Sequence, residues 1–131
     1  MLEVRLSIQF AIEFENYPAK DVALIGAFMT HCESAPLMDW IGKVGPSWKV
    51  PLAYHDRALR VAYAREHNLW HAHVGYPHWK ESRNEDADYK TSDYVVHFTY
   101  KPGDTFLKVV DYCDHGDPFR LPGEQYLVGE I

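Results

Sequence analysis

The first fourteen residues alternate between apolar and polar side chains. Every even position from Leu2 to Phe14 is apolar, and the odd positions carry mostly Glu, Arg, Ser and Gln. A period of two places all of these apolar side chains on one face of a β-strand. Because a slip of one residue would turn the whole apolar set toward water, such a strand has a strongly specified register. The pattern therefore predicts a half-buried strand over residues 2–14.

Two helices are expected next, separated by a long loop. Apolar residues at three- and four-residue spacing predict a helix over residues 18–34. Residues 55–67 are rich in Ala, Leu, Arg and Glu, which predicts the second helix. The intervening residues 36–54 hold three prolines and two glycines. This composition predicts an extended loop, which we expect Trp40 and Trp48 to hold against the domain.

Three further strands are expected in the second half of the chain. Residues 69–75 alternate between apolar side chains and two histidines, which is typical of a strand with one solvent-exposed face. Residues 94–100 and 106–113 are expected to form a hairpin around the Pro-Gly turn at 101–104. The polar run 80–92 is expected to be an exposed, mobile connection. The predicted fold is α+β, in the order strand, helix, helix and a three-stranded antiparallel meander, with one sheet packed on helices.

Length and composition favour one ordered domain. Of the 131 residues, 47% are hydrophobic and 24% are charged, so residues 1–131 are expected to form a single domain. No run approaches the roughly 18 apolar residues of a membrane span, and the N-terminal segment lacks the order of a signal peptide. These features predict a cytoplasmic protein without membrane association, in which Cys32 and Cys113 stay reduced.

The net charge argues against a free-standing nucleic-acid binder. At a formal charge of −6, the field of the molecule opposes phosphate backbones, and no DNA binding is expected. Between residues 41 and 65, however, five basic side chains face a single aspartate. Affinity for RNA would have to come from this local positive charge or from a larger particle that presents the RNA.

Histidines are expected to gather on one face of the sheet. His71 and His73 lie two apart on a predicted strand, so both imidazoles project from the same face. Alternation along the next two strands adds His97, and then Asp111 and His115. One sheet face is therefore predicted to carry a cluster of imidazoles.

Three interpretations of this cluster are open. In the first, the imidazoles act as general acids and bases, because histidine titrates near neutral pH. In the second, the His-x-His pair binds a divalent metal, and the remaining ligands come from neighbouring strands. The candidates for these ligands are His97, Asp111, Asp114 and His115. In the third, the histidines are surface or core residues that accumulate by chance.

The common nucleotide-binding and catalytic motifs do not occur. The segment 42–47 contains glycines and a lysine, but not at the spacing of a phosphate-binding loop. The sequence holds no Gly-x-Ser-x-Gly, no Cys-x-x-Cys and no His-Glu-x-x-His. Nucleotide binding and nucleophilic catalysis by Ser or Cys are therefore not expected.

Three segments resemble a known family of toxins. They are residues 68–75 (Asn-Leu-Trp-His-Ala-His-Val-Gly), residues 91–97 (Thr-Ser-Asp-Tyr-Val-Val-His) and residues 106–115. Together they resemble the YafO-type toxins of the RelE/ParE superfamily, over roughly residues 50–120. The Ser-Asp-Tyr-Val-Val strand, followed by a turn and a Leu-Lys-Val-Val-Asp strand, is similar to the paired final strands of that superfamily. The predicted order of elements is also the order that this fold uses.

This resemblance implies a RelE-like toxin of a type II toxin-antitoxin system. The implied activity is that of an mRNA interferase, an endoribonuclease that cleaves mRNA on the translating ribosome. The implied partners are the ribosome with its mRNA and a cognate antitoxin protein that blocks the toxin. Such cleavage needs a base for the 2′-hydroxyl, a cation for the phosphate charge and an acid for the leaving oxygen. The resemblance implies that histidines supply the acid and the base, without a metal or other cofactor.

The resemblance also implies roles for individual histidines. We expect His73 and His97 to be the acid/base pair, with His71 and His115 in support. Some members of the superfamily have a late histidine followed four residues on by an aromatic residue, and His115 and Phe119 match this spacing.

Three residues are expected to bind the substrate. Phe119 would stack on a base of the RNA. Arg120 or Lys108 would supply the cation that stabilises negative charge on the phosphate.

Three other functions are open. A ParE-like member would act on a protein target such as gyrase, because a shared fold does not determine function. A His-rich metal-binding enzyme would use the metal interpretation of the cluster. A non-catalytic module would recognise another protein through an aromatic surface made by Trp70, Tyr76 and Trp79.

Overall fold

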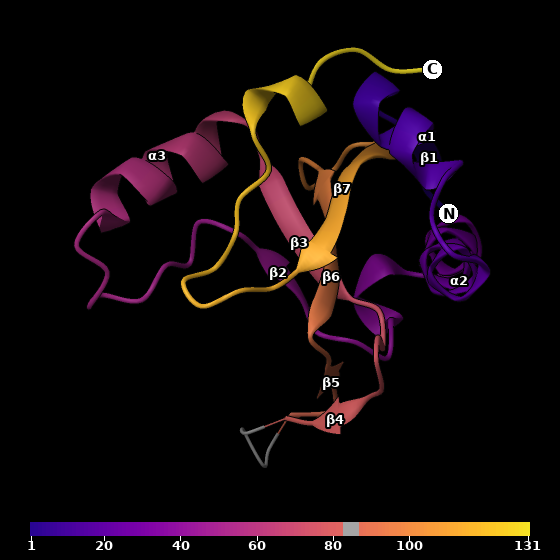
Figure 1. The fold of residues 1–131 in the computed structure, drawn as a ribbon, viewed down its shortest axis with the longest axis horizontal. Coiled ribbons are helices and arrows are strands. Elements are labelled where there is room, and N and C mark those ends of the chain that lie inside the picture. The colour runs from indigo at the N-terminus through magenta and orange to yellow at the C-terminus, as the bar shows by residue number, and fades with distance from the viewer. Residues whose placement is uncertain (83–86) are drawn as a thin grey trace.

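A mostly antiparallel sheet lies at the centre of the fold, with helices on both of its faces (Figure 1). The computed structural model describes residues 1–82 and 87–131, and these form a mixed α+β fold. The five strands of the sheet have the order β1-β7-β6-β3-β2. β1 runs parallel to β7, and each other pair of neighbours is antiparallel. The strands are β1 (Glu3–Leu6), β2 (Val44–Pro46), β3 (Leu69–His73), β6 (Tyr94–Thr99) and β7 (Phe106–Asp114).

The helices lie in two groups on opposite sides of this sheet (Figure 1). Helices α1 and α2 lie on one side, and α3 lies on the other. Within the described ranges, no helix has the length and apolar character needed to cross a membrane. The helical elements are α1 (Ile8–Phe14), α2 (Ala19–Ser34), α3 (Arg57–Glu66) and the short 3-10 turns η1 (Leu37–Asp39) and η2 (Glu124–Tyr126).

The predicted first strand is wrong over its second half, where the chain forms α1. The Ser7 hydroxyl caps this helix by accepting a hydrogen bond of 3.3 Å from the Phe10 N–H. Phe10 and Phe14 are four residues apart, so they meet on one helix face, where their rings stack at 5.4 Å. Ile12, apolar in the alternating pattern, is 55% exposed. A run of apolar residues at even positions therefore also satisfies the four-residue spacing of a helix, and the capping serine decides between the two.

The other predicted elements are confirmed at the level of type and place. The two predicted helices are α2 and α3, and the three later strands are β3, β6 and β7. The turn between β6 and β7 closes with a hydrogen bond of 2.9 Å from the Asp104 N–H to the Lys101 carbonyl.

The segment 36–54 is not wholly a loop, because β2 pairs with β3 at the edge of the sheet. As expected, its tryptophans hold it in place. The Trp40 indole N–H donates to the carbonyl of His73 at 2.8 Å, and the Trp48 ring lies 5.8 Å from that of Trp70. Gly42 is needed here, since a Cβ at this position would lie 2.2 Å from the same His73 carbonyl oxygen.

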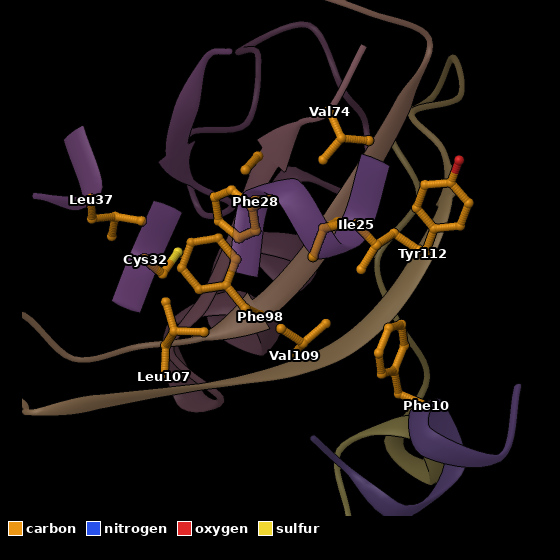
Figure 2. Close-up of a cluster of buried hydrophobic side chains, with 12 residues drawn as sticks. Phe10, Ile25, Phe28, Cys32, Leu37, Val74, Phe98, Leu107, Val109 and Tyr112 are labelled. Atoms are coloured by element: carbon orange, nitrogen blue, oxygen red, sulfur yellow. The ribbon is translucent and has the colours of Figure 1, made fainter. Parts of the chain in front are cut away.

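The larger core fills the space between the sheet and helices α1 and α2 (Figure 2). Phe28 of α2 packs against Phe98 of β6, with ring centroids 5.7 Å apart. Within this core the Tyr112 hydroxyl donates to the buried carboxylate of Asp21 at 2.5 Å. Side chains of β3, β6 and β7 that point to this face are apolar, as the alternation of each strand predicts. They include Ala72, Val96, Phe98, Leu107 and Val109, and Val74, directly after β3, packs in the same core.

A smaller core lies on the opposite face of the sheet. Ala64 of α3, Leu69 of β3 and Val110 of β7 are fully buried there, and Leu121 and Leu127 pack against them from the segment that follows β7. The expectation that this face of β3 is exposed to solvent is wrong, because α3 and the C-terminal segment cover it. This is the face that carries the histidines.

A bulge in β7 shifts its register against β6. His97 is opposite Asp111 and Phe98 is opposite Val109, so Val110 has no partner on β6. Such an extra residue changes which side chains face which side of the sheet. Leu107 and Val109, before the bulge, and Tyr112, after it, therefore face the same core although their parity differs.

The predicted connection 80–92 contains a second, two-stranded sheet. β4 (Lys80–Glu81) pairs with β5 (Lys90–Thr91) at the lower end of the view in Figure 1. The Lys90 amine donates to the Glu81 carboxylate at 2.9 Å across this pair. The part of the predicted mobile connection at residues 83–86 lies outside the described residues.

Candidate functional site

Four histidines and one phenylalanine come together on the α3 side of the sheet. The His73 and His115 rings have centroids 5.5 Å apart, and the His71 ring lies 6.0 Å from His73 and 5.9 Å from His115. The Phe119 ring lies 4.4 Å from His115 and 4.7 Å from His71. We call this group of His71, His73, His97, His115 and Phe119 the histidine cluster.

Two central strands position three of these side chains. His71 and His73 point to the same face of β3 because they are two residues apart. His97 of β6 lies directly opposite His71 in the antiparallel register, and their ring centroids are 6.4 Å apart. The pairing of β3 with β6 therefore creates the floor of the cluster.

The segment after β7 brings His115 and Phe119 over this floor. The His115 N–H donates to the Asp93 carbonyl at 2.7 Å, and the His115 carbonyl accepts from the Arg120 N–H at 3.0 Å. Phe119 is held from the α3 side, where Arg60 donates to its carbonyl at 2.6 Å and the Tyr54 hydroxyl accepts from its N–H at 3.3 Å. The backbone of the loop is thus fixed by hydrogen bonds at both His115 and Phe119.

Three of the imidazoles are each tied to an oxygen atom through Nδ1. His71 Nδ1 lies 2.9 Å from the Ser47 hydroxyl, and His115 Nδ1 lies 3.0 Å from the Gly116 carbonyl. His73 Nδ1 lies 2.7 Å from the Ser92 carbonyl and 3.0 Å from the Ser92 amide. Nδ1 of His73 donates to the Ser92 carbonyl when it carries the ring proton and accepts from the Ser92 N–H when it does not. In the first of these tautomers the lone pair of His73 is on Nε2.

Burial keeps the floor histidines neutral. Burial is the largest cause that lowers the pKa of His73, to about 4, and positive charge on His115 and Lys43 lowers it further. Burial, with His115, lowers the pKa of His97 to about 3. The pKa of His71 is also lowered well below its usual value, first by burial and then by the neighbouring histidines. At neutral pH these three rings are therefore uncharged and able to accept a proton or bind a cation.

His97 does not reach solvent. Its side chain is completely buried, and its Nε2 lies 3.5 Å from Sγ of Cys113. Within the described residues, its Nδ1 has no hydrogen-bond partner. A substrate cannot touch this ring, so the expected pairing of His97 with His73 as acid and base does not fit the structure.

A cavity of about 720 Å³ opens beside the cluster. His71, His115 and Phe119 line it, whereas His73 and His97 lie beneath its surface. Cations from the basic segment at residues 41–65 also reach it. The charged and aromatic residues that share this lining are Lys43, Lys49, Arg60, Trp40, Tyr54, Trp70 and Tyr89.

Neither of the two residues predicted to supply a cation, Lys108 and Arg120, lines the cavity. The Lys108 amine donates to the carbonyls of Leu127 at 2.8 Å and Gly129 at 3.2 Å, so it fastens the C-terminal segment and does not line the cavity. Arg120 is exposed in the same loop as His115 but does not line the cavity. Lys43 belongs to the segment 41–65, which stands out in the sequence only by its positive charge. Its ammonium group is close enough to His71 and His73 to lower the pKa of both.

The two aspartates that were candidate ligands have other contacts. Asp111 accepts from the Tyr112 N–H at 2.8 Å, and Asp114 accepts from the Gly116 N–H at 2.7 Å. Among the described residues, neither joins His71, His73 and His115 as a further neighbouring ligand. Asp111 lies opposite His97, as parity predicts, but the sequence could not show that both carboxylates bond to nearby backbone N–H groups.

Ser47 and Ser92 contact the cluster and could not be identified from the sequence. Both are buried and lie in segments without a periodic pattern, and their role depends on tertiary contacts with β3. In the sequence, Tyr54 and Arg60 are simply an aromatic residue and a positive charge near the start of a helix. Nothing in the sequence indicates that both contact Phe119.

Comparison of the chain with protein-family models, with curated proteins and with solved structures finds no match.

Proposed function

We propose that this protein is an RNA endonuclease with a RelE/ParE-like fold, the toxin of a type II toxin-antitoxin pair, and that it cleaves mRNA on the ribosome. The observation that carries the proposal is the cavity in which two imidazoles, an aromatic ring and several cations face the same space. General acid/base cleavage of RNA needs these groups together. The residue resemblance to YafO-type toxins supports the choice of RNA as substrate.

The cavity-lining histidines are the groups that would meet the substrate. The low pKa of His71 leaves it neutral, as a base that removes the proton of a 2′-hydroxyl must be. The resulting oxygen attacks the adjacent phosphorus, and the bond to the 5′-oxygen breaks. His115 would donate a proton to that leaving oxygen, so the products are a 2′,3′-cyclic phosphate and a 5′-hydroxyl. His73 and His97 lie on the buried side of the reacting rings and would hold them in place by ring contacts.

The remaining groups suit binding of the RNA. The backbone of Phe119 is held by Arg60 and Tyr54, and its ring packs on His115 and His71, which gives a preformed surface on which a base can stack. Lys43 and Lys49 line the same cavity and would stabilise negative charge on the phosphate. A strong field from the rest of this acidic molecule is not required, because the ribosome would present the mRNA.

Inducible expression in a bacterial host tests this proposal, with growth and the 5′ ends of cellular mRNAs followed together. We expect growth arrest and new cuts inside translated messages, both lost when translation is blocked. His71→Ala and His115→Ala should each slow cleavage at least about 100-fold, the usual contribution of general acid/base catalysis. His55→Ala is the matched control, because His55 is exposed and does not line the cavity.

Two outcomes would contradict the proposal. Normal growth with intact mRNA would exclude the nuclease. Growth arrest without RNA cuts would show that the toxin acts on a protein target instead.

A further inference from the structure

The imidazoles of His71, His73 and His115 are arranged as a metal ion would require. One ring nitrogen from each lies within 4.8 Å of one from each of the others. Three nitrogens bound to one Zn²⁺ at about 2.1 Å are roughly 3.4 Å apart. The nitrogens therefore need to close by at most about 1.4 Å to share one ion.

The outer contacts of these rings also match those of metal-binding histidines. A histidine that binds a metal through one nitrogen usually bonds through the other to a hydroxyl, carbonyl or carboxylate, which fixes the orientation of the ring. Each of the three rings has such a contact at Nδ1, which leaves Nε2 as the free nitrogen. The partners are the Ser47 hydroxyl at 2.9 Å, the Ser92 carbonyl at 2.7 Å and the Gly116 carbonyl at 3.0 Å.

From this geometry we propose that His71, His73 and His115 bind one divalent transition-metal ion through Nε2, with Zn²⁺ as the best match. A set of three imidazoles favours Zn²⁺, Cu²⁺, Ni²⁺ or Fe²⁺ over Mg²⁺ and Ca²⁺, which prefer oxygen ligands.

The site has three protein ligands and leaves the fourth position of a tetrahedral ion open. The nearby thiol of Cys113 contacts His97, so it is not a fourth ligand for the three rings. His71 and His115 line the cavity, so a water molecule or a small anion can reach the ion from that side. Phe119 packs on both of these rings and shields the position from bulk solvent.

This site does not depend on the proposed RNA cleavage. If both are present, they compete, because a bound ion takes the lone pairs that acid/base catalysis uses. Zn²⁺ is then expected to inhibit the nuclease and not to activate it.

Metal titration of the purified protein tests the inference without RNA or ribosomes. The full chain is prepared without a metal-affinity tag, stripped with a chelator and titrated with Zn²⁺ by calorimetry and with Co²⁺ by visible absorption. We expect one equivalent of each, and an absorption spectrum typical of four-coordinate Co²⁺. The absence of saturable binding by the intact protein would overturn the site.

Single variants link the binding to the three rings. His115→Ala should abolish stoichiometric binding, and the exposed His55→Ala should keep it. Ser47→Ala should weaken the affinity about 10- to 100-fold, because it removes an outer contact and no ligand. Circular dichroism and thermal unfolding confirm that each variant is folded. Unchanged affinity in His115→Ala would exclude the site even if the proposed nuclease activity is confirmed.

Discussion

Mild acid is expected to destabilise this protein, because its buried histidines must remain neutral to stay folded. His73 and His97 have pKa values of about 4 and about 3 in the folded chain, against about 6.5 when unfolded. Below pH 6.5 the unfolded chain therefore binds protons that the folded chain does not. Above about pH 6.5 the two neutral rings do not reduce the free energy of unfolding. As the pH falls toward the folded pKa values, protonation of the unfolded chain lowers this free energy progressively.

The size of the effect follows from these shifts. Between pH 7 and pH 5 each of the two histidines lowers the free energy of unfolding by about 2 kcal/mol. Burial raises the pKa of Asp111 to about 6, so its protonation in the folded chain opposes the loss by about 1 kcal/mol over the same range. We therefore expect a net loss of about 2 to 3 kcal/mol. His71, whose pKa is also lowered, adds to the loss.

Urea unfolding followed by tryptophan fluorescence measures this directly, at pH 7 and pH 5 with a chelator present. His73→Asn is the informative variant, because its amide can replace the Nδ1–H donor without titrating. It should remove about 2 kcal/mol of the pH-dependent loss, whereas the exposed His55→Asn should remove none. Equal free energies of unfolding at the two pH values in the intact protein would show that the buried histidines do not control its acid stability. So would a pH dependence in His73→Asn as large as that of the unchanged chain.

Three further predictions can be checked by the same unfolding measurement. Ser7→Ala removes the cap of α1 and should cost about 0.5 to 2 kcal/mol; no loss would mean that the cap does not select the helix. Tyr112→Phe leaves the buried Asp21 carboxylate without its donor and should cost about 1 to 3 kcal/mol; a neutral result would argue against this contact. Asp111→Asn should stabilise the chain by about 1 to 3 kcal/mol at pH 7, with a gain that disappears near pH 4 as the carboxyl of the unchanged chain becomes protonated. A constant gain across this range would contradict the raised pKa.

The fold was largely predictable where a segment has one strong period and clear limits. The apolar spacing along α2 and the Pro-Gly turn between β6 and β7 are local signals, and both elements form where they were expected. The first fourteen residues show the limit of such signals. Even spacing fits a strand, but positions four apart also share a helix face, and the choice depends on the Ser7 cap and on the packing of Phe10 and Phe14.

The sequence indicated which residues would form the site, but it indicated only partly what each of them does. Strand alternation brought His71, His73 and His97 to one face, and that geometry is present. Alternation could not show that α3 and the C-terminal segment cover this face, which buries His97 completely. It also could not show that Lys108, on the same face, is occupied by backbone carbonyls of that segment. These outcomes depend on contacts between residues far apart in the chain.

The unpaired residue in β7 marks the position at which this strand can change length without reversing its faces. Lys108, before the bulge, and Cys113, after it, have opposite parity in the sequence, yet both face the side of the sheet that carries the histidines. Deleting Val110 would restore strict alternation and leave the following side chains on their present faces, whereas losing a paired residue of β7 would turn the side chains that follow it through the sheet. Only in the second case would His115 and Phe119 approach from the wrong side. Among related sequences, a change of one residue in the length of β7 should therefore fall at this position, at the cost of the contact that Val110 makes in the smaller core.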